Sequence, residues 1–535
     1  MDYFVSNETL PWMASAQAYP IAGYAAVSNQ SPVTLGLTTF LAATVSFLAY
    51  QVYRPSVHPL SPKFTKDTFP ILGSIGFVTR QWSFFKNASR ESKTGNFSFW
   101  QGKTHIVGIT GAASRKMLLE HPQLDFVAAQ SLLAFGMHFW PPIHEIFHQT
   151  GHRARNNTHF LRTLLDLLKT SRIERVFSDC LLDAKTYFDD LRITNPSGVL
   201  NAPDVWPTVF KQSSRLFFAD DLANDPDLFA TTSSHLDVIL HSYSPFYAFC
   251  HWIIEPSMIR RRLARRGLRS TVQKVYRARK AGKSKYTDDA LQMMIDNGDS
   301  EEAITEFCAS GTFITTTNAH IIFPQLIETM AVHADWQEKC YQELVAAVEK
   351  HATKKDGRLV DRLATMPLGA WETSLPNLEL CMYEIIRVWT SFAVGRLNVS
   401  KEAIPIPGSN EVIPAGSYAV YNSTELNFDP NMFPDPHKFD PLRFTEGRRE
   451  FEKEPLGFFG WGAGMHPCAG KRWGKLQQNI LLAHALAIYK WTRCDKDGKP
   501  DLHAAANQDL GVELDSEAKF ALPAAYCKFE LREKA

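Results

Sequence analysis

A long apolar segment lies close to the N-terminus of the chain. The 21 residues from Val33 to Tyr53 carry no charge, and Arg54 is the first basic residue of the sequence. A helix of about 20 apolar residues spans the hydrocarbon core of a bilayer, and tyrosines such as Tyr50 and Tyr53 favour the membrane interface. The pattern therefore predicts one transmembrane helix over residues 31–53. A disordered tail before a soluble protein is the alternative.

The charges around this segment set its expected orientation. Basic residues collect on the cytosolic side of a membrane helix, so we expect residues 1–30 in the lumen and the chain after Arg54 in the cytosol. Asn7 and Asn29 each begin an Asn-x-Ser/Thr sequence on the lumenal side and are candidate glycosylation sites. A cleaved signal peptide would need a basic region before the apolar stretch, and the sequence has none there.

Residues 54–70 are rich in proline, with four prolines between positions 55 and 70. Proline fixes φ and stiffens a linker, so this segment is predicted to be a hinge. The patterns in residues 71–535 are mostly helical, with a few short strands and no internal repeat. We therefore predict one large domain that is mainly α with small β-sheets.

Composition and charge exclude some partners. The net charge of +1 gives no global attraction to nucleic acid. The eight cysteines are scattered without a Cys-x-x-Cys pair, which is typical of a reduced compartment. One block is unusual, because residues 260–285 contain twelve basic and no acidic residues. A nucleic-acid interpretation of one such block in a neutral chain is weak, and a solvated helix face is the simpler alternative.

The most specific candidate chemistry lies between Phe459 and Gly470. Here a single cysteine, Cys468, sits in a glycine-dense loop, and a helical pattern follows from Lys471 onward. Glycine lets a loop turn tightly and approach a flat ligand closely, while a following helix N-terminus favours a negative sulfur. The arrangement is suited to holding one thiolate against a metal. A buried structural cysteine in a turn is the alternative.

Three further motifs precede this loop. Glu384 and Arg387 share one face of a predicted helix, because they lie three residues apart. Arg396 precedes two short predicted strands within residues 404–420. A proline-punctuated loop then presents Arg443. Each of these motifs taken alone is common on protein surfaces, so only their combination and order carry weight.

Together the motifs resemble the cytochrome P450 family over about 460 residues, from near Pro70 to the end of the chain. The resemblance implies the cytochrome P450 fold, in which Glu384, Arg387 and Arg443 form a buried triad behind the cofactor. It also implies that this cofactor is heme b, with Cys468 as the axial ligand of its iron. A thiolate ligand pushes electron density toward bound dioxygen and favours O–O cleavage.

The same resemblance assigns other residues near the cysteine. Arg396 and His466 become candidates for hydrogen bonds to the heme propionates, and Gly464 and Gly470 for close approach to the heme. Family members usually have Phe where this chain has Trp461, and an indole can still shield the sulfur. They often have Arg where this chain has His466. Histidine changes its charge near neutral pH, so the propionate contact is expected to depend on pH.

The chain departs from the family on the side of the heme that binds oxygen. Family members usually carry an acid–threonine pair in a long helix there, but this segment has no Asp or Glu between Glu306 and Glu328. It offers three consecutive threonines at 315–317 instead. Three explanations are open: hydrogen bonds back to the helix carbonyls, a hydroxyl-and-water proton relay with Thr315 and Thr316 as candidate catalytic residues, or oxygen chemistry that needs little proton delivery.

The register of this segment against the family is also open. One count places Ile314 and Thr315 at the acid–threonine pair, and another places Thr317 and Asn318 there. His320 is a candidate substrate contact, although a lone histidine in a helix is more often a satisfied core residue.

The substrate is expected to be a hydrophobic small molecule from secondary metabolism, such as a terpenoid, a steroid or a polyketide-like compound. Aromatic side chains line pockets for ligands of this kind, but they are also common core residues. The aromatic residues at the family's pocket positions are Phe126, Phe135, Phe139, Trp140, Phe147, Phe217, Phe218, Phe246, Tyr247, Phe249 and Trp252.

The predicted function is therefore that of a monooxygenase in the endoplasmic reticulum membrane. The resemblance implies O2 as oxidant and electrons from NADPH through NADPH-cytochrome P450 reductase, with cytochrome b5 as a second candidate donor. Lys471, Arg472 and Lys475 would face such an acidic donor, and the basic block 260–285 would contact anionic membrane lipid. Two alternatives are a reductase-independent heme-thiolate isomerase or dehydratase that acts on a peroxide, and a non-catalytic heme-binding membrane protein.

Overall fold

The computed structural model divides the chain into two units, Met1–Ser56 and Val57–Ala535. The boundary falls inside the proline-rich segment 54–70. The residues that the structure describes are 31–133, 145–147, 158–242, 255–501, 514–515 and 524–532. Asn7 and Asn29 lie outside the described residues, so their glycosylation stays a prediction.

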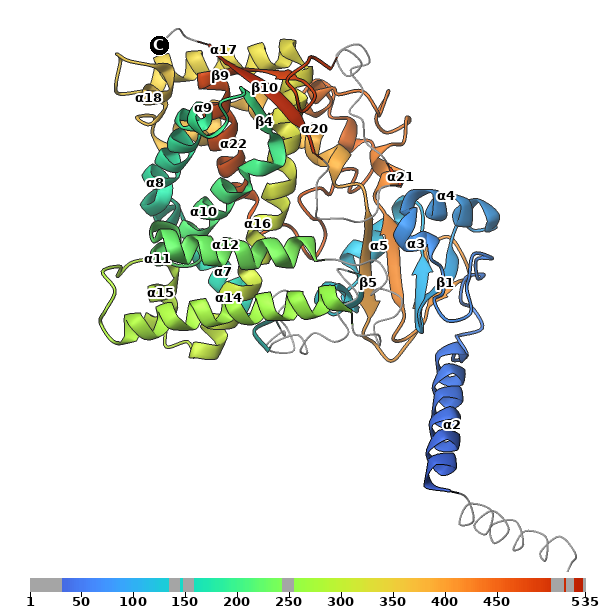
Figure 1. Cartoon of the computed structure of the whole chain (residues 1–535). Helices are drawn as coiled ribbons and strands as arrows, with labels where there is room; N and C mark the ends of the chain where they lie inside the picture. The colour runs from blue at the N-terminus through green and yellow to red at the C-terminus, as the bar shows by residue number, and fades with distance from the viewer. Residues whose placement is uncertain are drawn as a thin grey trace, which may run out of the picture. The chain divides into compact units, whose positions relative to one another are not determined.

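The smaller unit contains helix α2, which covers Pro32–Val52 (Figure 1). The side-chain oxygen of Ser31 caps the helix by accepting a hydrogen bond from the backbone N–H of Thr34 at 3.1 Å. In the described part of the chain, α2 is the single helix long and apolar enough to cross a membrane. Its role as a membrane anchor over residues 31–53 stays a prediction.

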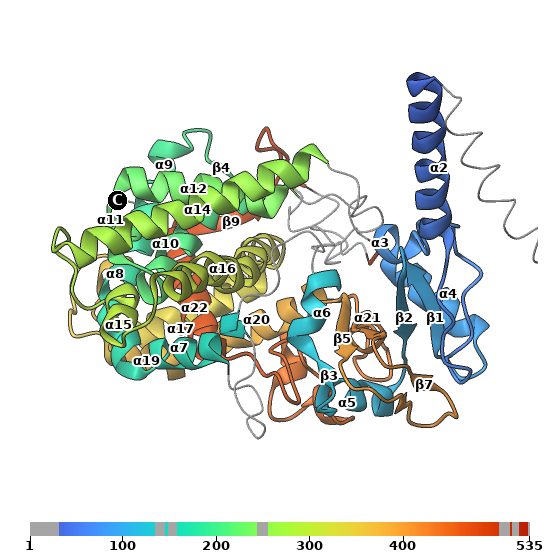
Figure 2. The ribbon, with the colours of Figure 1, turned by 90° about the horizontal axis from the view of Figure 1, so that it is seen from below.

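The helices of the larger unit are arranged around α16, which covers Glu301–Val332 and runs through the helical part in both views (Figures 1 and 2). Proline at the first turn marks the start of several neighbours, because its fixed φ suits a helix and its missing N–H needs no partner there. These neighbours are α10 (Trp206–Phe217), α12 (Pro226–His241), α14 (Pro256–Lys280) and α20 (Pro376–Trp389). Helices α12 and α14 lie side by side in both views.

The other helices fill the space around this group and connect it to the sheets. They are α3 (Gly76–Thr79), α4 (Gln81–Glu91), α5 (Ala112–Glu120), α6 (Phe126–Leu133), α7 (His159–Leu167), α8 (Thr170–Asp189), α9 (Leu191–Thr194), α11 (Asp220–Asn224), α15 (Ala290–Asp296), α17 (Ala334–His351), α18 (Leu359–Leu363), α19 (Leu368–Thr373), α21 (Thr424–Asn427) and α22 (Lys471–Ile488). Short 3-10 turns cover Glu145–Phe147, Ala202–Val205, Pro441–Phe444 and Glu450–Glu452.

Three small sheets lie in the described part of the larger unit. The five-stranded sheet has the order β1-β2-β8-β5-β3, and the three-stranded sheet the order β4-β10-β9. The strands are β1 (Phe97–Gln101), β2 (Thr104–Gly108), β3 (Leu124–Asp125), β4 (Val199–Asn201), β5 (Ala393–Asn398), β6 (Ile404–Pro405), β7 (Val412–Ile413), β8 (Tyr418–Asn422), β9 (Tyr489–Arg493) and β10 (Tyr526–Leu531). The second predicted strand within 404–420 is divided at Pro414, which separates β7 from β8.

The main hydrophobic core lies among α8, α10, α16, α17, α20 and α22, and each face of the five-stranded sheet adds a smaller cluster. Both central helices that carry the predicted site motifs, α20 and α22, contribute to this core. The prediction of a mainly α fold with small sheets is confirmed. Burial of α20 and α22 holds the loops at their ends in fixed positions.

Candidate functional site

The Cys468 thiol is held in an accessible position by a closed loop. Among the seven cysteines that the structure describes, Cys468 is exposed and the other six are buried. Its backbone N–H donates a hydrogen bond of 2.7 Å to the Trp461 carbonyl, which closes the loop. Helix α22 begins immediately afterwards, at Lys471. This geometry offers one thiol to a ligand, whereas the remaining described thiols fill core space.

Two glycines give the loop its shape. Gly462 and Gly464 have φ of +66° and +62°, in the left-handed region that favours glycine. A Cβ on Gly464 would lie 2.2 Å from the Leu119 carbonyl oxygen. The next residue, Met465, donates its N–H to that same carbonyl at 2.9 Å. Gly464 therefore lets the loop pack directly against the end of α5.

We expect Gly464→Ala to disrupt this loop. The substitution adds backbone strain on the order of 1–3 kcal/mol and forces the loop away from Leu119. The ratio of heme to protein in the purified variant should fall well below that of the natural protein. Gly447→Ala is the matched control, because a Cβ there meets no atom within 4 Å. Equal heme content in both variants would contradict this account of the loop.

The local environment gives the Cys468 thiol two opposing influences. Although the thiol is exposed, the surrounding protein partly desolvates it and raises its pKa, while the hydrogen bond from the Gly470 backbone N–H and the charge of Lys471 lower it, and the pKa remains raised overall. The protein groups alone do not hold the sulfur as a thiolate. A coordinated metal cation deprotonates a thiol outright, so the loop is suited to a thiolate that a metal ion completes.

A buried cation, Arg396, lies beside this loop and forms no ion pair with any of the residues that the structure describes. Arg396 is 4% exposed, and its Nε atom has no hydrogen-bond partner. Burial lowers its pKa, the charge of Asp125 opposes this in part, and the net result is a pKa of about 10. The guanidinium lies 4.7 Å from the centre of the Phe126 ring, and the His466 ring lies 5.3 Å from the same ring. A buried charge of this kind is costly unless an anion pairs with it.

His466 is neutral at physiological pH in this environment. Burial, and to a smaller extent the nearby charge of Arg396, lower its pKa to about 4. A neutral imidazole can still donate one hydrogen bond. Arg396 and His466 together therefore offer donors to an anionic group that enters beside Phe126. A heme propionate fits this description.

Glu384, Arg387 and Arg443 are in direct contact and almost fully buried. Arg387 donates from Nε and Nη2 to the two carboxylate oxygens of Glu384, both at 2.8 Å. Arg443 Nε donates to Glu384 at 3.2 Å, and its Nη1 lies 3.1 Å from Glu450. Arg387 also donates to the Pro436 carbonyl at 2.8 Å. Helix α20 is thereby tied to the loop that contains Arg443.

The threonine hydroxyls of α16 are mostly occupied by the helix itself. Those of Thr312, Thr315 and Thr317 each donate to the carbonyl oxygen four residues earlier, at 2.6, 2.9 and 2.6 Å. Thr316 is fully buried and its hydroxyl has no hydrogen-bond partner. Hydrogen bonds back to the helix carbonyls, one of the three explanations above, therefore account for Thr315 and Thr317.

The two predicted relay residues, Thr315 and Thr316, differ in how close they lie to the exposed side of α16. Ile314 is 43% exposed and Asn318 is also exposed, one turn later. Thr315 is half-buried and lies beside them on the helix surface. At 3.6 residues per turn, Thr316 points to nearly the opposite side. The placement of Thr315 therefore suits a role on the open side of the helix, and that of Thr316 does not.

His320 is buried, but it is not a satisfied core residue as the simpler sequence interpretation would have it. It is 2% exposed, and neither ring nitrogen has a hydrogen-bond partner. Burial lowers its pKa to about 4. It lies one turn beyond Thr316 on the side of α16 that faces Trp206, with the two rings 6.3 Å apart. This position is away from Ile314 and Asn318.

Comparison with known proteins agrees with this geometry. The sequence model of the family described as Cytochrome P450 matches residues 62–512. The chain is 46% identical over 521 residues to cytochrome P450 monooxygenase claM of Passalora fulva, covering 97% of each chain. It is 44% identical over 503 residues to cytochrome P450 monooxygenase nsrP of Aspergillus novofumigatus, covering 93% of this chain and 96% of that protein.

The chain belongs to the cytochrome P450 family. A solved structure described as retinoic acid bound cyanobacterial CYP120A1 has the same fold, with a TM-score of 0.66 and 16% sequence identity. That alignment covers 89% of this chain and all of the other. Membership confirms the predicted P450 fold and a monooxygenase activity. It also implies a heme with a cysteine thiolate ligand on its iron.

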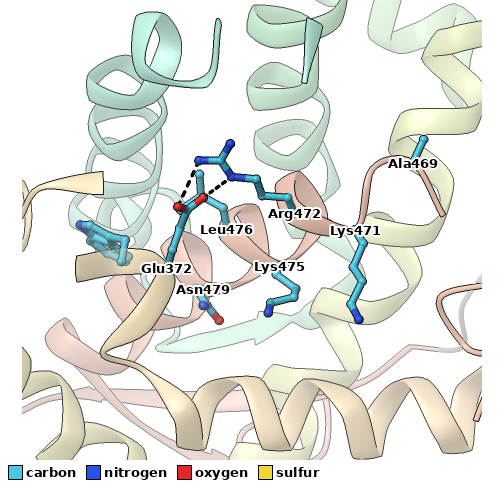
Figure 3. Close-up of a pocket in the computed structure, with 8 residues that line it drawn as sticks. Glu372, Ala469, Lys471, Arg472, Lys475, Leu476 and Asn479 are labelled. Carbon is cyan, nitrogen blue, oxygen red and sulfur yellow. Dashed lines mark hydrogen bonds and ion pairs between the residues drawn. The ribbon is translucent and has the colours of Figure 1, made fainter. Parts of the chain in front are cut away.

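The face of this P450 that lies next to the cysteine loop contains a cavity of about 470 Å³ (Figure 3). It is lined from α19 and α22, and by Ala469, which directly follows Cys468. Arg472 donates to Glu372 at 2.6 Å and 3.1 Å. Lys475 pairs with Glu379 of α20. Two of the three cations predicted to face a donor are therefore already paired within the protein.

The basic block 260–285 of this P450 is also partly neutralised. Arg265 and Arg269 pair with the buried carboxylate of Glu306, which in addition accepts a hydrogen bond from Ser310 at 2.6 Å. Arg279 pairs with Asp221 and Asp289. Sequence reasoning missed these pairs because the acids lie on other helices. These three arginines of the block therefore hold α14 against α11, the start of α15, and α16.

The aromatic positions fall into three groups. Phe126 contacts the Arg396 and His466 side chains described above. Phe217 and Phe218 are buried in the core and are not available to a ligand, and the Phe147 ring packs on Phe160. The others lie outside the described residues and stay predictions: Phe135, Phe139, Trp140, Phe246, Tyr247, Phe249 and Trp252.

Proposed function

We propose that this P450 binds heme b and oxidises a hydrophobic small molecule of secondary metabolism. The observation that carries the proposal is the presence in one region of an accessible thiol, Cys468, and a buried cation, Arg396, that forms no ion pair within the described part of the chain. Cys468 serves as the iron ligand, and Arg396 and His466 hold the propionates. Bound heme supplies the oxygen activation, which a thiolate ligand favours. The carbon-monoxide difference spectrum of the purified protein tests this assignment.

The residues around the cysteine have supporting roles in this proposal. Trp461 covers the sulfur and orients the loop through its carbonyl. Gly464 and Gly470 keep the backbone close to the heme without side chains in the way. The triad of Glu384, Arg387 and Arg443 holds the region behind the heme rigid. These roles follow the family pattern and the contacts given above.

Proton supply to the open side of α16 is assigned to Thr315. Its hydroxyl is positioned by the Gly311 carbonyl and borders the exposed surface at Ile314 and Asn318. An ordered water on this hydroxyl would replace the carboxylate that most of the family carries. This choice supports the register in which Ile314 stands at the acid position.

We expect Thr315→Ala to uncouple the reaction. Loss of the hydroxyl breaks the water chain, so product formed per NADPH consumed should fall by a factor on the order of ten or more. Thr316→Ala and Thr317→Ala are the matched variants, and both should keep most of the coupling. Unchanged coupling in all three variants would remove the relay and favour the peroxide chemistry described below.

The electron donor is assigned to NADPH-cytochrome P450 reductase, with cytochrome b5 as a second candidate. The cavity beside Ala469 supports this, because a partner seated there lies next to the ligand loop. The protein is further assigned to the endoplasmic reticulum membrane as a single-pass protein with a cytosolic P450 domain. Helix α2 supports that assignment, as do its uncharged sequence and the Arg54 that follows it.

Part of the basic block supports a contact with membrane lipid. On the outer side of α14, Ile259 and Leu263 are 47% and 59% exposed, and Arg266 and Lys274 are exposed along the same side. Apolar and basic side chains on one face suit an anionic bilayer surface. Terpenoid, steroid and polyketide-like molecules would reach the protein from such a surface.

A second candidate function is that of a reductase-independent isomerase or dehydratase acting on a peroxide. The observation that favours it is the absence of any carboxylate between Glu306 and Glu328. Turnover of candidate substrates with NADPH and reductase, compared with turnover of their peroxides without either, separates the two functions. A normal carbon-monoxide spectrum without any turnover would favour a non-catalytic heme protein.

A further inference from the structure

The cavity of Figure 3 is placed where a partner protein would come nearest to the heme ligand. Its wall includes Ala469, the residue after Cys468, and its floor includes the fully buried Trp371 of α19. Most of the remaining lining comes from the first two turns of α22. A carboxylate side chain that enters the cavity would therefore lie near Ala469, the residue that follows the iron ligand Cys468.

The charges of the cavity are almost balanced within the chain. Arg472 is held by both oxygens of Glu372, and Lys475 by Glu379. Lys471 has no acidic partner among the described residues and lies over the Tyr383 ring, 5.5 Å from its centre. Three cations and two acids leave one net positive charge, which is much less than the sequence of α22 suggests.

Both ion pairs are suited to exchange. The side chains of Arg472 and Glu372 are 38% and 25% exposed, and those of Lys475 and Glu379 are 26% and 27% exposed. Neither pair is fully buried, so an external carboxylate can reach each cation and compete with its internal partner. Arg472 also has a hydrogen bond to Thr170 at 2.8 Å, which holds the guanidinium in place during an exchange.

We propose that Glu372 and Glu379 are internal competitors for the cations that an acidic electron-donor protein uses to dock at this cavity. The inference rests on the proposed function, in which a reductase supplies the electrons. Lys471 makes the first contact, because it has no competing acid. Glu372 and Glu379 then weaken the complex and favour its rapid dissociation between electron transfers.

The proposal predicts the effect of removing each internal acid. Glu372 and Glu379 each occupy a docking cation, so their removal should tighten the complex with an acidic partner, whereas removal of an acid far from the cavity should not. Glu372→Gln and Glu379→Gln should each lower the reductase concentration that gives half-maximal NADPH-dependent turnover, by about threefold at low ionic strength. Lys471→Ala should raise it by a similar factor. The differences should shrink at high salt, because the charges are screened.

The matched control is Glu91→Gln, which removes one exposed acid at the end of α4 that pairs with Lys66 and does not line the cavity. It should leave the half-maximal concentration unchanged. The carbon-monoxide spectrum establishes equal heme loading for every variant. Glutamine keeps a hydrogen bond to each cation, so both Glu variants retain the local structure, and either one alone suffices for the test.

Two results would overturn the inference in different ways. If Lys471→Ala weakens the complex but neither Glu variant tightens it, the partner docks here without competition, and the reductase assignment stands. If none of the three variants changes the half-maximal concentration, the partner docks elsewhere. A heme-loaded protein that turns over its substrate without any reductase would instead remove the proposed donor itself.

Discussion

Cys468→Ala should abolish the red-shifted Soret band that the ferrous carbon-monoxide complex of a thiolate-ligated heme shows. No other described cysteine can replace it, because the other six are buried in the core. Arg396 and His466 would still attract the propionates, so some heme should remain bound without the thiolate signature. The measurement is the carbon-monoxide difference spectrum of the variant, together with its heme content.

The control for this variant is Cys494→Ala, which removes a buried sulfur at the end of β9. This variant should keep the thiolate band even if its stability falls slightly. Retention of the band in Cys468→Ala would contradict the assignment of the iron ligand. It would also remove the basis for the roles proposed for Trp461, Gly464 and Gly470.

Local sequence was sufficient for the parts of the site that depend on neighbours in the chain. The glycine-dense loop at Cys468 requires left-handed φ angles, which glycine alone adopts freely. The Glu384–Arg387 pair follows from helical spacing, because residues three apart meet on one face. Both features are properties of short segments, so their residue types and spacing already define them.

Contacts between distant segments could not be read in the same way. Glu372 precedes Arg472 by 100 residues, and nothing in the sequence around either residue indicates the other. The pairs between Glu306 and the block 260–285 could not be read from the sequence for the same reason, because Glu306 lies on α16 and its arginine partners lie on α14. Helical periodicity does separate Thr315 from Thr316. Which side of α16 is open, however, depends on how the other helices pack around it.

The second large effect is expected from the buried triad. Glu384, Arg387 and Arg443 are each 0–1% exposed, and Glu384 accepts hydrogen bonds from both arginines. Truncation of one member leaves buried charge without its partner, which costs on the order of 3–5 kcal/mol. That is a large share of the stability of a typical folded protein. Glu384→Ala and Arg443→Ala should therefore yield almost no soluble, heme-loaded protein.

Arg448→Ala provides a control in the same loop as Arg443. Its side chain is 36% exposed and pairs with Asp440 and Glu450, so its loss should cost less than about 1 kcal/mol. Recovery of normal heme-loaded protein from both Glu384→Ala and Arg443→Ala would show that the triad does not hold the fold together. If Arg443→Ala yields almost no soluble, heme-loaded protein while Arg448→Ala yields a normal amount, the effect is assigned to the buried charge. Both substitutions remove an arginine from one loop, and they differ mainly in burial.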